Sequence, residues 1–456
     1  MPVSPLAWQR HTLSAEMRRA LLAALPLMGA QVLSIGNGMV DALVAGRLGA
    51  AELAAVGIGA GVLFMITLSS IGMLAGLSPT MARLRGQGRR ADVGVVFRQG
   101  LWLASGLIVI DLAILAACAL TIDQWGLDAG IVQPMQAYLG TAMWSLPGTV
   151  LLVTARNLCE ATARAKPILF VQLAGLIINL FADLGLGLGY FGLPRLGVAG
   201  IGWSTTIVQS VTCLILFMLL RGRTYQRFVP YAPMERPDPV RLLALLSLSA
   251  PICLMLLCES GLFVATGIQM GMIGTVAAGA HNIAITTSAA TYMLPLGLSF
   301  ALTARMGVAF GRGSVSGLRL RVVSGVLLTL LLACVTSLLL VVFRHPIAAL
   351  YTSDPEVRSL AASMLILGAV FQLSDGLQAT MIGLLRGVQD TRVPMFINAF
   401  AYWGIGFGTG YLAAHRFGFG AYGLWFGLIA GLSVAALLQG FRLMNRLRFL
   451  ETNTGR

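Results

Sequence analysis

Arginine and lysine are distributed very unevenly between the connections of about twelve long apolar segments. Each segment has the roughly 20 residues that an α-helix needs to cross the hydrocarbon core of a bilayer. If the odd-numbered connections lie outside, they hold only five of the 31 basic residues, and the other 26 lie in the termini and the even-numbered connections. The five are Arg47, Arg195, Arg344, Arg358 and Arg416. Because basic residues concentrate on the cytoplasmic side of membrane proteins, this pattern predicts a multi-pass inner-membrane protein with both termini in the cytoplasm.

The apolar segments predict an all-α membrane protein with twelve transmembrane helices. The predicted spans cover residues 20–44, 52–76, 99–121, 131–155, 167–191, 197–220, 242–271, 276–304, 320–343, 358–384, 394–414 and 420–442. Charged residues make up only 11% of the chain, against about 25% in soluble domains, which fits a surface that mostly faces lipid. The net charge of +14 follows from the cytoplasmic excess of arginine, so we expect no nucleic-acid partner.

The second half of the chain weakly repeats the first half. Pro26 opens the first span and Pro251 opens the seventh, while Pro167 at the fifth span recurs as Pro394 at the eleventh. A near-constant offset between such pairs, over six spans, predicts two six-helix lobes related by a pseudo-twofold axis along the membrane normal. We expect an N-terminal lobe over residues 1–220, a cytoplasmic linker over 221–241 and a C-terminal lobe over 242–456.

Five acidic residues fall well inside predicted spans, where an ionised carboxylate costs at least about 2.5–3.5 kcal/mol. They are Asp41, Asp111, Asp183, Glu259 and Asp375. No arginine or lysine is expected deep in any span, so these acids should lack a fixed positive partner. They must then be protonated, bind a metal cation or face water. All three conditions suit a site that loads and unloads a cation.

The five acids differ in their sequence surroundings. Asn179 lies one turn before Asp183 on the same helix face, and a carboxylate with an amide at this spacing predicts a proton or cation site. Glu259 has no basic neighbour in the sequence. Asp111 has only apolar neighbours, which fits equally well a packed helix–helix contact and a protonated residue without function.

Three stretches of the sequence resemble one transporter family. Residues 40–49 (VDALVAGRLG), followed by 53–56 (LAAV), are similar to the opening signature of the multidrug and toxic compound extrusion (MATE) family. Residues 156–160 (RNLCE), leading to Lys166 and Pro167, resemble its NorM-like branch, and so do residues 385–394 (LRGVQDTRVP). The similarity covers essentially all twelve predicted spans.

This resemblance implies a V-shaped fold of two lobes and the export of small cationic, amphipathic drugs in exchange for Na⁺ or H⁺. It implies a cation site in the C-terminal lobe at Glu259 and Asp375, which could hold Na⁺. In the N-terminal lobe it implies that Asp41, with Asn179 and Asp183, handles protons or substrate. The residues expected to line the cavity are Gln31, Asn37, Thr205, Phe371 and Gln378. Phe371 stands where relatives can have a tyrosine, which removes a possible oxygen near the cation.

Two other classes of transporter stay open at this point. A major facilitator-type transporter would share the twelve spans and the repeat, but its usual motif in the second connection contains an aspartate that residues 81–90 lack. A lipid-linked sugar flippase of the wider superfamily would favour basic residues inside the cavity, and none is visible. No phosphate-binding loop and no clustered catalytic set is present in the sequence. We therefore expect a secondary antiporter, not an enzyme, which acts as a monomer and needs no cofactor besides the coupling ion.

Overall fold

The computed structural model describes residues 5–126 and 128–454, and it contains helices but no strand within this part of the chain. Ten of the helices described are long and apolar enough to cross a membrane, or eleven if the bent pair α5 (Ala129–Ala142) and α6 (Ser145–Ala161) counts as one span. The predicted all-α, multi-pass fold is confirmed. By its internal contacts the chain divides into two compact units.

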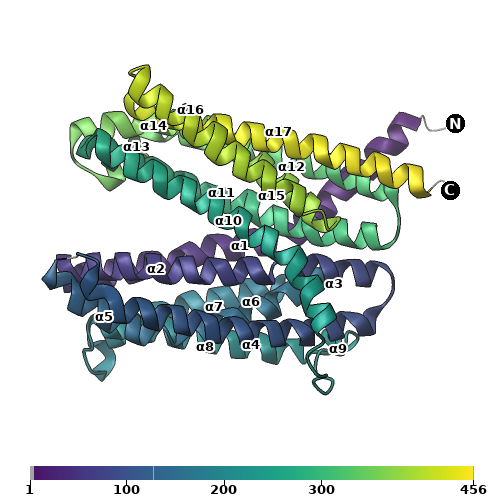
Figure 1. The fold of residues 1–456 in the computed structure, drawn as a ribbon, viewed down its shortest axis with the longest axis horizontal. Coiled ribbons are helices and arrows are strands. Elements are labelled where there is room, and N and C mark those ends of the chain that lie inside the picture. Colours follow the sequence, from purple (N-terminus) through teal and green to yellow (C-terminus); the bar gives the residue numbers. More distant parts are fainter. Residues whose placement is uncertain (1–4, 127, 455–456) are drawn as a thin grey trace. The chain divides into compact units, whose positions relative to one another are not determined.

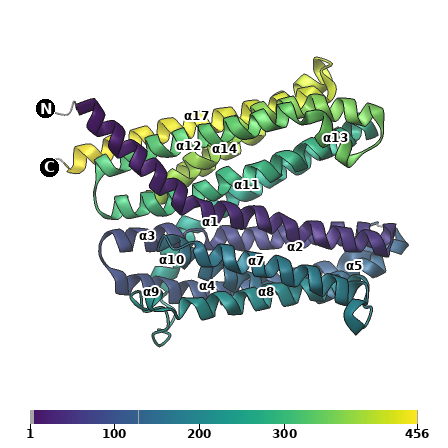
Figure 2. The same cartoon turned by 180° about the vertical axis from the view of Figure 1, so that it is seen from behind.

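The N-terminal unit comprises Gly29–Cys253. It contains α5, α6 and the second part of α1 (Pro5–Leu48), from Gly29 onward. Its other elements are α2 (Ala50–Leu74), α3 (Leu77–Gly86), α4 (Arg90–Thr121), η1 (Ile122–Gln124), α7 (Lys166–Ala182), η2 (Asp183–Gly187), η3 (Tyr190–Gly192), α8 (Val198–Leu220), α9 (Arg223–Gln226) and the beginning of α10 (Pro239–Ile273). Helix α8 packs against α5, α6 and α7 (Figures 1 and 2). The core between these helices buries Tyr138, Leu139 and Ile201, and the inner faces of α7 and η2 bury Asn179 and Asp183.

The C-terminal unit comprises the beginning of α1, up to Met28, and the chain from Leu254 onward. It contains the rest of α10 and α11 (Thr275–Gly311), α12 (Val315–Val342), α13 (Arg344–Tyr351), α14 (Pro355–Gly387), α15 (Arg392–Ala399), η4 (Phe400–Phe407), α16 (Gly408–Tyr411), η5 (Leu412–Arg416) and α17 (Gly420–Thr454). Helix α14 packs against α11, α12 and α17 (Figures 1 and 2). It is therefore the central helix of this unit, and Gln372, Asp375 and Gln378 in its middle are buried.

The predicted span at 394–414 is helical but irregular. It is divided into α15, the π-helical η4, α16 and the π-helical η5, and each piece is too short to count as a span. Glycines at this segment allow a close backbone contact with α17, since a Cβ added to Gly427 would lie 2.6 Å from the Gly410 backbone nitrogen. A second π-helical stretch, η2, falls at the glycine-rich end of the fifth predicted span.

The predicted repeat recurs in the contacts inside the units. A Cβ added to Gly72 of α2 would lie 2.5 Å from Cys253 Cα of α10, and one added to Gly297 of α11 would lie 2.6 Å from Met28 Cα of α1. Gly72 and Gly297 are separated by the same offset as Pro26 and Pro251, and so are Met28 and Cys253. Each unit therefore packs the beginning of one proline-containing helix, α1 or α10, against an equivalent glycine.

Ion pairs at equivalent positions hold these two helix beginnings. In the C-terminal unit the buried Glu16 of α1 pairs with Arg305 of α11 and, at 3.5 Å, with Arg321 of α12. In the N-terminal unit Arg98 of α4 pairs with Glu235, shortly before α10, and the offset of the repeat relates Arg98 to Arg321. The beginnings of α1 and α10 thus group with the opposite half of the sequence. The predicted lobe boundaries, the pseudo-twofold axis and the V shape concern the placement of the halves and stay predictions.

Candidate functional site

Asp41, Asn179 and Asp183 meet inside the N-terminal unit, as their sequence pattern predicts. Asp41 lies on α1, Asn179 on α7 and Asp183 at the start of η2. Asn179 Nδ2 donates to Asp41 Oδ1 at 2.9 Å and to Asp183 Oδ2 at 3.4 Å. The two carboxyl groups also interact electrostatically with each other. One amide therefore joins two acids from different helices.

The other predicted N-terminal residues lie in different surroundings. Thr205 donates a hydrogen bond of 3.1 Å to the Ile201 carbonyl oxygen and also hydrogen-bonds to the buried Tyr138. Tyr138 interacts electrostatically with Asp41. Gln31 accepts a hydrogen bond of 2.6 Å from Arg156 Nη2, and Arg156 also pairs with Glu160 at 2.9 Å. Gln31 of α1 therefore contacts an ion pair on α6, and it is not a member of the cluster around Asp41. The side-chain oxygen of Asn37 is buried and has no hydrogen-bond partner among the described residues.

Glu259 and Asp375 form the centre of a second polar cluster, in the C-terminal unit. Glu259 lies on α10 and Asp375 on α14, and the charge of Glu259 acts on Asp375. Asp375 is only 3% exposed, and its Oδ1 has no hydrogen-bond partner among the described residues. The structure thus brings the two predicted acids of this half into one electrostatic environment.

The expectation that these acids lack a fixed positive partner is wrong for Glu259. Helix α14 continues to Gly387, past the predicted end of the tenth span at residue 384, so that Arg386 lies within the helix. Arg386 is buried and interacts electrostatically with Glu259. The hydropathy pattern places this arginine in a connection, because its charge ends the apolar segment.

Two tyrosines that the sequence analysis missed complete the C-terminal cluster. Tyr292 of α11 and Tyr402 of η4 both interact electrostatically with Glu259 and Asp375. The oxygen of Tyr402 accepts hydrogen bonds from Gln378 Nε2 at 2.5 Å and from Asn398 Nδ2 at 3.4 Å, and Gln439 donates to Asn398. The i, i+4 spacing of Asn398 and Tyr402 within an apolar segment is a signal that could have identified them.

Phe371 has a packing role in this cluster. Its ring lies between those of Phe263 and Trp425, with centroid distances of 6.2 and 5.7 Å. Phenylalanine supplies no oxygen here, and the phenol groups that interact with Glu259 and Asp375 belong to Tyr292 and Tyr402 on neighbouring elements. Asp111, the fifth acid, accepts a 2.6 Å hydrogen bond from Ser70 of α2. This bond makes Asp111 a helix–helix contact, one of the two alternatives left open for it.

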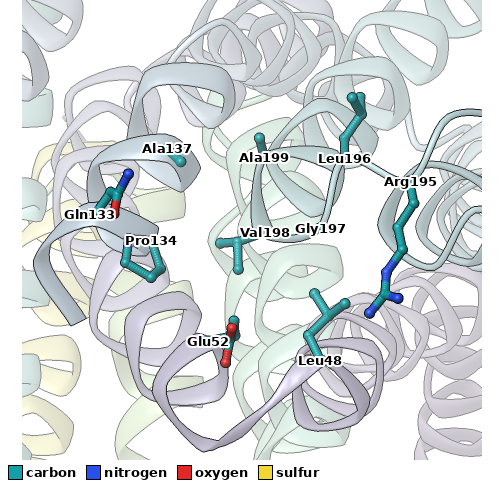
Figure 3. A pocket seen from close by; sticks show the side chains of 10 residues that line it. All are labelled: Leu48, Glu52, Gln133, Pro134, Ala137, Arg195, Leu196, Gly197, Val198 and Ala199. Atoms are coloured by element: carbon teal, nitrogen blue, oxygen red, sulfur yellow. The ribbon is translucent and has the colours of Figure 1, made fainter. Parts of the chain in front are cut away.

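A pocket of about 440 Å³ opens in the N-terminal unit (Figure 3). Figure 3 shows Glu52, Gln133 and Arg195 around it, with the apolar side chains of Leu48, Pro134 and Val198 between them. None of the residues predicted for the site lines this pocket. It lies at the connections that the charge pattern assigns to the outside.

The acids are too dispersed for a metal site built from charged ligands alone. Within residues 5–126 and 128–454, no group of three or more His, Cys, Asp or Glu side chains could hold a metal ion. A cation at Asp375 would therefore need neutral oxygen ligands as well. The fold and these buried acids together define a multi-pass, all-α membrane protein with one polar cluster in each helical unit.

Comparison with known proteins identifies the family. The sequence model of the MatE family matches residues 26–184 and 251–412, and the chain belongs to this family. The resemblance noted in the sequence is thereby confirmed.

Two curated relatives match over nearly their whole length. The chain is 35% identical over 434 residues to "Multidrug resistance protein MdtK" of Yersinia pseudotuberculosis serotype O:1b (strain IP 31758), a match that covers 94% of this chain and 95% of the relative. It is also 35% identical over 442 residues to "Probable multidrug resistance protein NorM" of Xanthomonas campestris pv. campestris (strain ATCC 33913 / DSM 3586 / NCPPB 528 / LMG 568 / P 25), covering 96% of each.

Solved structures share the fold at lower identity. The chain is similar to the eukaryotic MATE transporter AtDTX14, with a TM-score of 0.87, 18% identity and coverage of 97% of this chain and 99% of that one. It is also similar to the Vibrio cholerae MATE transporter VcmN in its bent form, with a TM-score of 0.84, 19% identity and coverage of 97% and 99%. These likenesses support the twelve-helix, two-lobe layout.

Proposed function

We propose that this protein is a secondary antiporter that exports cationic, amphipathic drugs across the bacterial inner membrane in exchange for Na⁺ or H⁺. Glu259 and Asp375 hold the coupling cation in the C-terminal unit. Asp41, Asn179 and Asp183 carry a proton or bind substrate in the N-terminal unit, and Gln31, Asn37, Thr205, Phe371 and Gln378 line the transport pathway. The protein acts as a monomer with both termini in the cytoplasm and needs no cofactor.

The observation that carries this proposal is the unpaired oxygen of Asp375. A buried acceptor without a donor costs roughly 1–3 kcal/mol, and more if it is charged. Because Asp375 is buried away from water, binding of a cation is favoured, and its release requires water or a competing charge. A cationic drug and a coupling ion that both act on such a site shift the same conformational equilibrium, which is the requirement for exchange.

The names of the relatives support multidrug substrates. The curated relatives from Yersinia and Xanthomonas are described as multidrug resistance proteins. Membership of the MatE family disfavours a major facilitator-type transporter. A flippase for an anionic lipid-linked sugar would need free basic side chains in its cavity, whereas the buried Arg386 is balanced by Glu259.

The test is ethidium export from proteoliposomes that contain the purified protein, with a Na⁺ gradient and a proton gradient imposed separately. We expect export with at least one gradient, and a loss of at least about tenfold in Glu259→Gln, Asp375→Asn and Asp41→Asn, because each substitution removes a charge that the cation or drug neutralises. Asp111→Asn is the matched control, since asparagine can still accept the hydrogen bond from Ser70.

Two results would contradict the proposal. Gradient-driven export that is unchanged in all three variants would remove the proposed sites. Export that proceeds without any ion gradient but requires ATP would remove the antiport mechanism as a whole.

A further inference from the structure

Two glutamines flank Asp375 on α14. Gln372 lies three residues before it and Gln378 three residues after it, so that each glutamine is a neighbour of Asp375 on the helix surface. The glutamines are 1% and 0% exposed. A helix in the middle of an apolar unit thus presents one carboxylate between two amides.

The nitrogen atoms of both amides are anchored to neighbouring elements. Gln372 Nε2 donates to the Ser288 carbonyl oxygen at 2.6 Å and to Thr291 Oγ1 at 2.5 Å, both on α11. Gln378 Nε2 donates to the oxygen of Tyr402 in η4 at 2.5 Å. Because an amide group is planar, fixing its nitrogen also fixes the direction of its oxygen.

The oxygen atoms of the same three side chains have no partner. Gln372 Oε1, Asp375 Oδ1 and Gln378 Oε1 are all buried, and each lacks a hydrogen-bond donor among the described residues. Buried polar atoms are normally paired in folded proteins. Three unpaired acceptors at neighbouring positions of one helix are the pattern expected of a site for a cation.

The charges of the cluster match a monovalent ion. Arg386 interacts electrostatically with Glu259, and Glu259 with Asp375, so one positive and two negative groups give the ionised cluster one formal net negative charge. A hard cation binds carboxylate and carbonyl oxygens, and several of them together replace its water. A proton on Asp375, in contrast, can be donated to only one of the two amide oxygens and leaves the other without a partner.

We propose that Gln372 and Gln378 supply two neutral oxygen ligands to a Na⁺ ion held by Asp375, and that they make this site select Na⁺ over H⁺. The proposal rests on the antiport function proposed above and specifies its coupling ion in the C-terminal unit. Tyr402 is a positioning residue, because it holds the amide nitrogen of Gln378 and so orients the oxygen that binds the ion.

The experiment measures ethidium export from proteoliposomes at constant pH while the Na⁺ concentration is varied. Gln372→Met and Gln378→Met replace the amide by an apolar group of similar length. Each should raise the half-saturating Na⁺ concentration by at least about fivefold, the lower end expected for the loss of one buried polar interaction, while the maximal rate changes less. Gln269→Met, the same substitution on α10 of the same unit, is the matched control and should leave both values unchanged.

A second pair of variants separates ion binding from structural support. Gln378→Glu loses the amide nitrogen but keeps an oxygen, so its half-saturating Na⁺ concentration should not exceed that of the unmodified protein. A rise as large as that of Gln378→Met would show that the glutamine acts only as a tether and would overturn the proposal. Tyr402→Phe removes the acceptor that orients Gln378 and should raise the half-saturating concentration in the same direction. If the methionine variants do not reach the membrane, Tyr402→Phe serves as the test of the role proposed for Gln378.

The possible failures of the two proposals are distinguishable. Unchanged Na⁺ dependence in the methionine variants, with Na⁺-driven export intact, would overturn the assignment of the ligands and leave the antiport function standing. Export driven by a proton gradient alone, with no response to Na⁺, would do the same. Export without any gradient would overturn both proposals.

Discussion

Asn179 shows how much the role of one residue depends on its neighbours in space. In the sequence it is an amide one turn before Asp183, and the pair could be read from the spacing. The structure adds Asp41, which lies 138 positions away in the chain and accepts from the same nitrogen atom. Periodicity predicts pairs within one helix, but a contact between helices depends on how the helices pack.

Glu235 offers a test of electrostatics outside the membrane spans. Its carboxylate accepts a 3.1 Å hydrogen bond from Arg98 Nε, and this bond lowers the pKa of Glu235. Because the pKa is lower in the folded state, the ion pair stabilises the protein above the ordinary glutamate pKa, and the contribution is lost as the pH falls through the lower, folded-state value.

We therefore expect Glu235→Gln to lower the free energy of unfolding by roughly 0.5 kcal/mol at neutral pH, a small effect because the carboxylate is partly exposed and screened by solvent. The difference in unfolding free energy between this variant and the unmodified protein should shrink as the pH falls below about 4.3. Thermal unfolding of both purified proteins as a function of pH measures this difference. A difference that stays constant down to the lowest pH would show that the ion pair is not its cause.

At the scale of helices, glycine decides how closely two elements approach. Gly72 lets α2 touch the backbone of α10, since an added Cβ would lie 2.5 Å from Cys253 Cα. Gly57, on the same helix, has no atom within 4 Å of the position of its Cβ. The two positions therefore form a matched pair in which only one glycine is required for packing.

We expect Gly72→Ala to destabilise the protein by about 1–3 kcal/mol, because the clash is with backbone and forces the helices apart. Gly57→Ala should be neutral or stabilising by up to about 1 kcal/mol, since alanine favours helix. Thermal unfolding in detergent compares the two. Equal stabilities for both variants would argue against the close contact between α2 and α10.

The sequence predicted the existence of the helices better than their regularity. Eleven of the twelve predicted spans correspond to helices or to the bent pair α5–α6 that pass a length and hydropathy criterion. The segment 394–414 does not, because its helix widens into the π-form at η4 and η5. Hydropathy measures only how apolar a segment is and carries no information on the backbone hydrogen-bond pattern that distinguishes a π-helical turn from an α-helical one.

For the whole molecule, the distribution of arginine predicts an orientation that labelling can test. In Figures 1 and 2 the beginning of α1 and the end of α17 lie at the same end of the C-terminal unit, in agreement with termini on one side of the membrane. Arg416 lies in a connection assigned to the outside and Arg227 in one assigned to the cytoplasm, and both are exposed.

In a variant without the exposed Cys334, we expect Arg416→Cys to react with a membrane-impermeant maleimide in intact cells. Arg227→Cys should react only after the cells are permeabilised. The reason is that basic connections stay on the cytoplasmic side during insertion. The opposite labelling pattern would reverse the assigned topology.

The sequence by itself determined the membrane class, the helical fold, the repeat and the acids of both clusters. These features depend on hydropathy, charge and spacing along the chain, and the bilayer imposes them on any sequence with this pattern. Only the tertiary structure decided that Arg386 balances Glu259, that Tyr402 joins the C-terminal cluster, and that Gln372 and Gln378 leave their oxygens unpaired beside Asp375. Such relations arise where residues from different helices meet. The meeting point is set by the packing of side chains and glycines between the helices, and the local sequence does not specify this packing.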